Sequence, residues 1–329
     1  MDFSFTDEQE TLRREARAFL EERFPAERVA ELADSDEGWD PASWRELAEL
    51  GWLGVSIPEE AGGAGLGFIE EAVLLEELAR ALYPGPYFST VALALPALSP
   101  EEQARVAAGE ARWSAEVDGL VPDLGAVDWV VADGAAVRAQ GHVLPTMDAT
   151  RRLGRLAAEA ERGASVGAID RPRLLAALAA EAVGIAQRAL EIGVEHARTR
   201  TQFGRPIGVY QAVSHSLADT YVETELARSL AYWAAWCVAE DDTQADVAGA
   251  AAKSFAADAA VAACERAIQV LGGIGFTWEH VLHRYYKRAQ WIQSFAGFGA
   301  VLRADVARAV LEGGEAAELD GAALAAEVG

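Results

Sequence analysis

The chain has 329 residues, 51% of them apolar and 24% charged, which is the balance of a globular protein with a large core. The formal net charge of −24 argues against nucleic acids and anionic membrane surfaces as partners, because both require a basic protein surface. Cys237 and Cys264 are too few for a disulfide framework or a zinc site, and no uninterrupted apolar run reaches the length of a membrane span. The chain begins polar and acidic, unlike a signal peptide, so we expect a cytoplasmic protein.

Residues 1–100 predict a helical N-terminal domain. Thr6 and Gln9 form a capping box ahead of the first amphipathic helix. Two further helices are predicted over residues 41–54 and 69–84. Paired acidic residues in this part are interpreted as solvated helix faces or loops: Asp7-Glu8, Glu59-Glu60 and Glu76-Glu77.

Residues 101–165 predict a small, partly β middle segment. Short apolar runs flank Asp133-Gly134, which is the sequence of a type I′ hairpin turn. The segment is short for an independent domain.

Residues 166–313 predict a C-terminal four-helix bundle. Long amphipathic stretches are joined by short connections, as in such bundles, and they cover residues 171–200, 209–240, 245–273 and 281 to the region of 311. The Ala/Glu-rich tail 314–329 is expected to fray. The predicted fold class is therefore mainly α.

A glycine cluster, "QVLGGIGF", lies between the third and fourth of these helices and contains Gly272, Gly273 and Gly275. Glycine is costly inside helices, so its presence needs a reason. Either the cluster caps a helix and turns the chain, or it lets the backbone approach a ligand closely. The pattern alone leaves both readings open.

Three stretches and the order of the segments resemble the acyl-CoA dehydrogenase family of flavoenzymes. "LAELGWLGVSIPEEAGGAGLGF" is similar to the family's N-terminal helical domain, "RTQFGRPIGVYQAV" to its Arg-x-x-Phe-Gly segment, and "QVLGGIGFTWEH" to its Gln-x-x-Gly-Gly segment. The alternation of helical, short β and helical regions is also the family's architecture. The resemblance covers most of the chain.

The resemblance implies FAD as the cofactor. Family members are usually tetramers in which each FAD crosses a subunit interface, and the two C-terminal motifs contact the ADP part of a neighbour's FAD. A guanidinium pairs a pyrophosphate with two prongs, and glycines let the main chain come close. By match, the cofactor-binding residues here are Arg200, Thr201, Gln202, Phe203, Gln211, Gln269, Gly272 and Gly273. No metal is expected, since Glu279, His280 and His283 do not have the His-Glu-x-x-His order of a zinc site.

The chain departs from the family at the flavin ring and at the catalytic base. The family's β-barrel motifs, Thr-Glu-Pro with Gly-Ser and Trp-Ile-Thr or Ser, are absent from residues 101–165. The family base is a glutamate that removes a proton α to the thioester carbonyl. In the Tyr-Glu-Gly-Thr-like stretch Gln293 falls at or beside its position, and at the alternative position Arg173 and Leu174 stand instead. No catalytic residue is therefore predicted in this chain.

Glu181 is the remaining candidate for a base. It lies on one helical face with Leu174, Leu178 and Ile185, so burial could raise its pKa and make it a base. The other reading is a glutamate that is paired with a cation across the bundle or an interface.

The matches and departures together resemble the smaller, degenerate subunit of an α2β2 heterotetrameric acyl-CoA dehydrogenase of the kind that degrades steroid side chains. The expected partners are a larger catalytic subunit that supplies the barrel and the base, an acyl-CoA substrate and an electron-transferring flavoprotein. Two alternatives stay open: a self-sufficient acyl-CoA dehydrogenase that uses Glu181, and a helical scaffold that binds no flavin.

Overall fold

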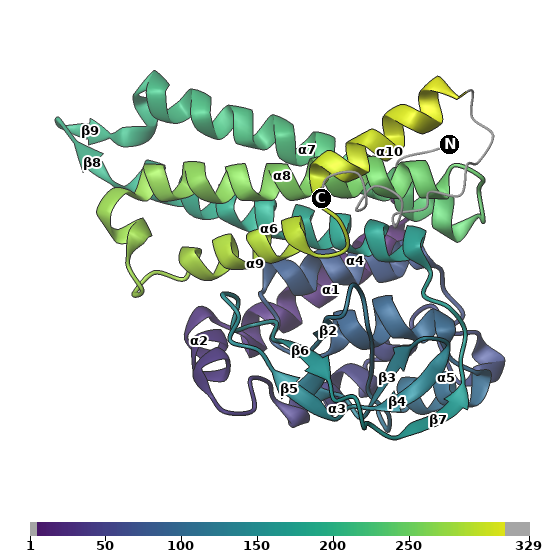
Figure 1. Cartoon of the computed structure of the whole chain (residues 1–329). Coiled ribbons are helices and arrows are strands. Elements are labelled where there is room, and N and C mark those ends of the chain that lie inside the picture. Colours follow the sequence, from purple (N-terminus) through teal and green to yellow (C-terminus); the bar gives the residue numbers. More distant parts are fainter. Residues whose placement is uncertain (1–4, 313–329) are drawn as a thin grey trace.

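The computed structural model describes residues 5–312, so the tail predicted to fray lies outside the described residues. Figure 1 shows the long C-terminal helices lying across the top of the molecule, with the N-terminal helices and the small sheets beneath them. The chain is mainly helical, which confirms the predicted fold class.

The N-terminal part is built from short helices. The predicted capping box is present, because Thr6 Oγ1 accepts from Gln9 N and the Gln9 side chain accepts from Thr6 N. The π-helix Phe88–Ala94 was not predicted, since every one of its residues is buried and it shows no amphipathic period. The helices here are α1 (Asp7–Arg23), α2 (Ala26–Asp34), α3 (Pro41–Glu49), η1 (Trp52–Gly54), η2 (Glu59–Ala61), α4 (Phe68–Arg80), η3 (Phe88–Ala94), η4 (Leu95–Ala97) and α5 (Pro100–Ala107).

The middle part contains two small sheets. The strands are β1 (Trp113–Ala115), β2 (Val121–Pro122), β3 (Trp129–Ala132), β4 (Ala135–Arg138), β5 (Gly141–Val143), β6 (Leu153–Leu156) and β7 (Arg162–Ser165), with η5 (Leu124–Ala126) between β2 and β3. One sheet has the order β1-β3-β4-β7 and the other β2-β6-β5. Asp133 and Gly134 connect β3 to β4 with φ of 48° and 70°, which confirms the type I′ turn.

The C-terminal part is a helix bundle whose elements are α6 (Arg171–Thr199), α7 (Gln211–Ala239), α8 (Ala245–Leu271), α9 (Leu282–Ser294) and α10 (Gly299–Leu311). The predicted fourth helix is interrupted between α9 and α10, where Ala296 and Gly297 adopt φ of 56° and 102°. The hairpin of β8 (Thr201–Gln202) and β9 (Arg205–Pro206), followed by η6 (Ile207–Val209), projects from one end of the bundle (Figure 1). η7 (Gly272–Phe276) follows α8 at the same end.

Helix α6 lies at the centre of the molecule, between α4 and α8. All residues from 174 to 186 are buried, because α6 is covered on every side. A Cβ on Gly184 would lie 2.1 Å from the Glu76 carbonyl oxygen, so glycine is required where α6 crosses α4. By length and composition residues Ala245–Phe276 are apolar enough for a membrane helix, but 72% of their most apolar window is buried inside the bundle. We therefore interpret α8 as a core helix.

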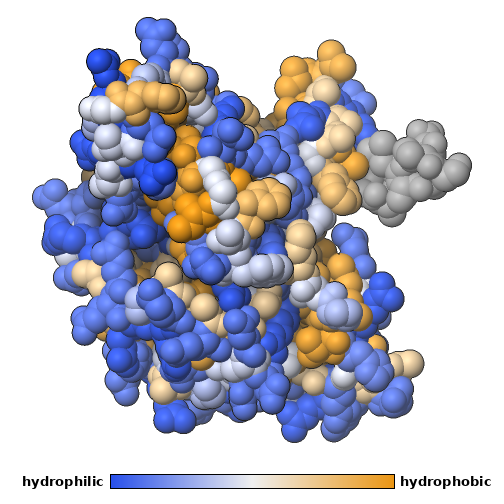
Figure 2. All heavy atoms as spheres, turned by 90° about the vertical axis from the view of Figure 1, so that its left-hand side faces the viewer, coloured by the Kyte–Doolittle hydropathy of each residue, from blue (hydrophilic) through white to orange (hydrophobic). Residues whose placement is uncertain are grey.

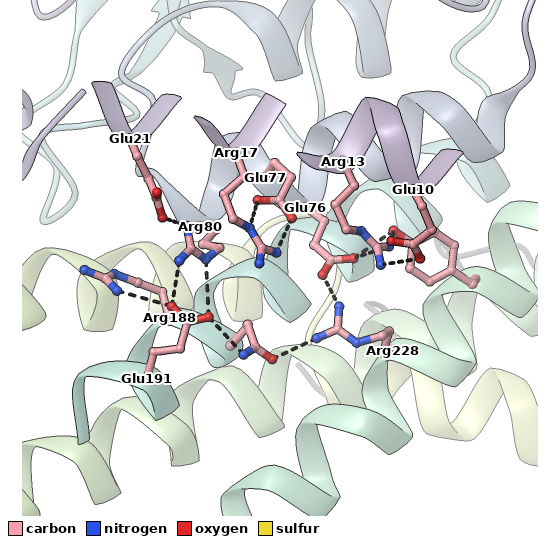
Figure 3. Close-up of polar contacts among 12 residues, drawn as sticks. Glu10, Arg13, Arg17, Glu21, Glu76, Glu77, Arg80, Arg188, Glu191 and Arg228 are labelled. Atoms are coloured by element: carbon pink, nitrogen blue, oxygen red, sulfur yellow. Dashed lines mark hydrogen bonds and ion pairs between the residues drawn. The ribbon is translucent and has the colours of Figure 1, made fainter. Parts of the chain in front are cut away.

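A row of ion pairs joins the N-terminal helices to the bundle (Figure 3). Glu76 and Glu77 are each only 1% exposed, so their interpretation as a solvated face was wrong. Glu77 accepts hydrogen bonds from Arg17 at 2.9 and 2.6 Å, and Glu76 accepts one from Tyr232 at 2.7 Å and pairs with Arg228. The error arose because α4 is covered by α1 on one side and by the bundle on the other.

Candidate functional site

A cavity of about 320 Å³ lies between the start of α6 and the turn that joins α9 to α10. Leu174 on α6 and Ala296-Gly297 in the α9–α10 turn both line it. The remaining lining residues are Glu116, Val117, Asp118, Ile169, Arg171, Val301 and Leu302.

Gln293, at or beside the position expected for the family base, is not among the residues that line this cavity. It lies on α9, and its Nε2 donates to Asp258 Oδ1 at 2.8 Å. Arg173, at the alternative base position, pairs with Glu71 and donates to Ser56 Oγ at 3.0 Å. Neither Gln293 nor Arg173 offers a carboxylate, which is the group that a proton transfer of the expected kind requires.

Glu181 is buried in the bundle, 1% exposed, but it is not a free carboxylate. Its Oε2 and Oε1 accept hydrogen bonds from Arg151 Nη1 and Nη2 at 2.5 and 2.6 Å. Burial opposes the charge on Arg151, but Glu181 outweighs this effect and the pKa of Arg151 is raised. The guanidinium also lies over the rings of Phe88 and Trp291, with its central carbon 4.4 and 5.0 Å from their centroids. The geometry therefore matches the interpretation of Glu181 as a glutamate that is paired with a cation.

A second buried ion pair lies in the same region. Arg288 donates to Asp148 Oδ2 at 2.5 Å and to Thr150 Oγ1 at 2.7 Å. Asp123 belongs to the same group of charges, and its carboxylate accepts a hydrogen bond from Ser89 Oγ at 2.9 Å. Burial raises the pKa of the Asp123 carboxyl to about 6, although the positive charge of Arg151 opposes this shift. The sequence did not predict this cluster, because its residues lie far apart along the chain and follow no regular spacing. The one indication in the sequence was Glu181, a charged residue within an apolar helical face.

The eight predicted FAD-contact residues are all exposed and lie at the end of the bundle from which the hairpin projects (Figure 1). Arg200 ends α6, Thr201 and Gln202 form β8, Gln211 begins α7, and Gln269 lies in the last turn of α8. Phe203 forms the hairpin tip with φ of 51° and is 91% exposed. Gly272 and Gly273 belong to η7. An apolar cluster holds these ends together: Leu190, Val194, Ala197, Ile207, Val213, Leu217 and Val270.

The three glycines of "QVLGGIGF" have different structural reasons. A Cβ on Gly275 would lie 2.9 Å from Leu271 Cβ, so packing excludes a side chain. Gly272 has φ of 66° and ends α8, which confirms the helix-cap reading at that position. Gly273 has neither reason, because a Cβ there would meet no atom within 4 Å. Close approach of a ligand to the backbone would explain Gly273.

The hairpin segment at this end, residues 196–215, contains no aspartate or glutamate, although the chain carries a net charge of −24. Within residues 5–312, Arg198, Arg200 and Arg205 have no carboxylate at ion-pair distance. Unpaired guanidiniums beside open glycine backbone are a fitting donor set for a pyrophosphate.

Large apolar side chains are also exposed at this end. Phe203, Phe276 and Trp278 are 91%, 83% and 78% exposed. Figure 2 views the molecule from this side and shows apolar atoms gathered among hydrophilic ones. Exposed apolar groups of this kind mark interaction surfaces.

Glu279, His280 and His283 do not gather into a metal-binding group in the part of the chain that the structure describes. His280 Nδ1 accepts from the backbone N–H of Leu282 at 3.1 Å. The His283 ring packs edge-on against Trp278, with centroids 4.8 Å apart. These side chains organise the turn after η7.

Comparisons with known proteins agree with this geometry. The acyl-CoA dehydrogenase N-terminal domain matches residues 6–105, and the acyl-CoA dehydrogenase C-terminal domain matches residues 167–311. Acyl-CoA dehydrogenase IpdE2 of Mycolicibacterium smegmatis is 36% identical over 302 residues, which cover 86% of this chain and 93% of that relative.

Two solved structures are similar over nearly their full length. The ChsE4-ChsE5 complex from Mycobacterium tuberculosis has a TM-score of 0.84 at 26% identity and covers 95% of this chain and 99% of that chain. The Tcur3481-Tcur3483 steroid ACAD has a TM-score of 0.83 at 27% identity and covers 94% of this chain and 99% of that chain. With both domains matched and a relative above 30% identity over most of its length, this chain belongs to the acyl-CoA dehydrogenase family.

Proposed function

We propose that this chain is the smaller subunit of a heteromeric acyl-CoA dehydrogenase. FAD is the cofactor of the family. The chain would contribute ADP-side contacts and assembly, while a larger partner subunit would supply the flavin-ring site and the catalytic glutamate. The observation that carries the proposal is that Glu181, the remaining candidate base of this chain, is buried and paired with Arg151, while Gln293 and Arg173-Leu174 stand where the family base is expected.

The bundle end supports a role toward a neighbour's cofactor. Arg200 would pair the pyrophosphate with two N–H groups, which an ammonium cannot do. Gly272 and Gly273 would let the η7 backbone approach, and Phe203 would insert into the partner from the hairpin tip. FAD, when bound across such an interface, supplies the electron acceptor for dehydrogenation of the acyl-CoA.

The middle part supports the division of labour between subunits. The strands are two to four residues long and form two small sheets, which supports placing the flavin-ring site in the partner subunit. The space between this part and the bundle is occupied by Arg151, Glu181, Asp148 and Arg288.

The substrate would be a bulky, ring-bearing acyl-CoA, such as a steroid side-chain thioester. This rests on the likeness to a steroid ACAD and to the ChsE4-ChsE5 complex. The assembled enzyme should have a higher kcat/KM for a steroid side-chain CoA than for octanoyl-CoA. A preference for octanoyl-CoA would remove the substrate proposal and leave the subunit proposal standing. An electron-transferring flavoprotein as acceptor and a cytoplasmic location remain predictions.

Co-expression with candidate larger subunits, followed by native mass spectrometry, tests the assembly. We expect two copies of this chain, two copies of the partner and two FAD molecules. A homotetramer of this chain that carries FAD would contradict the proposal.

A self-sufficient enzyme is the main alternative. Its base would have to be Glu181 or one of the carboxylates that line the cavity, Glu116 and Asp118. Substituting Glu181→Gln or Glu116→Gln should leave turnover of the assembled complex within a few-fold of wild type. A loss of about 10² to 10⁴ in rate, with assembly and flavin intact, would identify a base in this chain.

A further inference from the structure

Helices α7, α8 and α10 form an open groove of about 520 Å³ on the bundle. In Figure 1 α7 and α10 lie along the upper edge of the molecule, whereas the small sheets lie at the lower edge. Both helices pack on α8, which forms the floor between them. The floor is shallow in side-chain volume, because four of its five residues are small: Ala251, Ser254, Phe255, Ala259 and Ala262.

The α7 wall of this groove carries a ridge of exposed apolar side chains. Val222 and Leu226 lie one helical turn apart and are 54% and 51% exposed, and Tyr221 beside them is 57% exposed. Leu226 lies on the same helical face as Leu230, which lines the groove, so the ridge borders the groove directly. Apolar side chains that are exposed together in this way mark an interaction surface.

A ridge beside a groove of the same apolar character is self-complementary. When two identical chains meet about a two-fold axis, the same patch lies on both sides of the contact. The ridge of each copy can then enter the groove of the other. An unrelated protein that filled the groove would leave the exposed ridge without an explanation.

The charges in the groove also favour a second copy of this chain. The chain carries a net charge of −24, so most contacts between two copies would bring like charges together. In the groove Glu223 pairs with Arg266 at 2.7 Å, and Asp258 pairs with Arg303 at 2.8 Å. The other lining residues are uncharged, so two copies can approach here without net repulsion.

We infer that this groove and ridge form the contact between the two copies of this chain in the heterotetramer; the inference rests on the proposed function. The larger subunit is assigned to the hairpin end, where α7 begins at Gln211. Leu226 follows Gln211 by 226 − 211 = 15 residues, which is about 22 Å along the helix. The two surfaces are therefore separate, and one chain can contact the larger subunit and a second copy at the same time.

The substitution Leu226→Arg tests the contact in the assembled complex. Leu226 is half exposed, so the chain should fold, and the added positive charge reduces the net negative charge that could push two copies apart. Native mass spectrometry should show one copy of each subunit with one FAD, in place of two copies of each with two FAD molecules. The matched control is Leu50→Arg, because Leu50 is a 47% exposed leucine at the end of α3, and it should leave the heterotetramer intact.

A Leu226→Arg complex that remains a heterotetramer would overturn the inference. Loss of the larger subunit or of FAD would overturn it as well, because the groove would then contact the larger subunit.

If Leu226→Arg does not assemble, cross-linking of Tyr221→Cys decides the question. Cys237 and Cys264 are buried, so a short bis-maleimide should react at the new thiol. We expect a covalent dimer of this chain in the complex and none with the control Leu50→Cys. The absence of that dimer, or a product with the larger subunit instead, would contradict the inference. Failure of the proposed function is separate, because the wild-type preparation would then lack the larger subunit before any variant is compared.

Discussion

Arg151 and Arg200 show how differently one residue type is used in this chain. The Arg151 side chain is 3% exposed and held by Glu181, whereas Arg200 ends α6 in an exposed position. The motif around Arg200 could be found in the sequence because its residues are contiguous. The Arg151–Glu181 pair could not, because 30 residues separate its members and only the packing of the middle part on α6 brings them together.

Arg200→Ala should weaken FAD retention by the assembled complex. Loss of a charge-assisted contact costs about 1.5 to 3 kcal/mol, which corresponds to roughly 10- to 150-fold in the FAD dissociation constant. Arg200→Lys should recover only part of this, because the two-pronged geometry is lost. Fluorimetric FAD titration measures both. Arg155→Ala is the control, because Arg155 is an exposed arginine of β6 in the middle part. Unchanged occupancy in Arg200→Ala would argue against the motif.

Asp123 should make stability depend on pH. Burial raises the pKa of its carboxyl from an ordinary 3.8 to about 6, so the folded chain binds this proton more tightly than the unfolded chain. Its contribution to stability is full below the unfolded pKa and is lost as the pH rises through about 6. Relative to Asp123→Asn, which keeps the hydrogen bond from Ser89, wild type should lose about 1 kcal/mol of unfolding free energy between pH 5 and 7.5.

Denaturant unfolding of both proteins at each pH measures this difference. Asp118→Asn is the matched control, since Asp118 also has a left-handed backbone, with φ of 52°, but lies on an exposed turn. A difference between wild type and Asp123→Asn that stays constant with pH would contradict the assignment.

At the scale of elements, the sequence predicted those features that depend only on residues close together in the chain. The capping box at Thr6, the hairpin turn at Asp133-Gly134 and the long helices α6 to α8 follow from spacing and turn chemistry. The break between α9 and α10 was missed because Ala296 is a helix former by propensity and takes φ of 56° only in its tertiary context. The burial of α4 on two sides was also missed, because it too depends on tertiary packing. The acidic residues of α4 pair with arginines that are distant in the sequence (Figure 3).

The ion-pair row gives an element-scale prediction. Glu76→Ala removes the buried carboxylate that Arg13 and Arg228 share and leaves Arg228 with only the partly exposed Glu225, so it should lower the unfolding free energy by about 3 to 5 kcal/mol. Glu10→Ala removes a pair on the same row whose glutamate is 52% exposed and should cost at most about 1 kcal/mol. Urea unfolding with unchanged m-values measures both. Equal effects would show that burial does not set the strength of this row.

At the scale of the whole molecule, an acidic chain carries a hairpin end with exposed arginines and open glycine backbone, and a buried cluster of ion pairs where the middle part meets the bundle. The hairpin end is visible in the sequence, because residues 196–215 contain no acidic residue. The buried cluster is not visible, because it depends on the middle part folding against α6 and α9. The proposed function, contact with a cofactor held mainly by a partner subunit, accounts for the hairpin end, and the division into domains at residues 100 and 165 stays a prediction.

The flavin content of the purified chain tests this account most directly. The ratio of flavin absorbance near 450 nm to protein should be measured for the chain alone and for its complex with a larger subunit. The account predicts almost no flavin on the chain alone and about one FAD for each pair of subunits in the complex. A stoichiometric flavin on the isolated chain would contradict it.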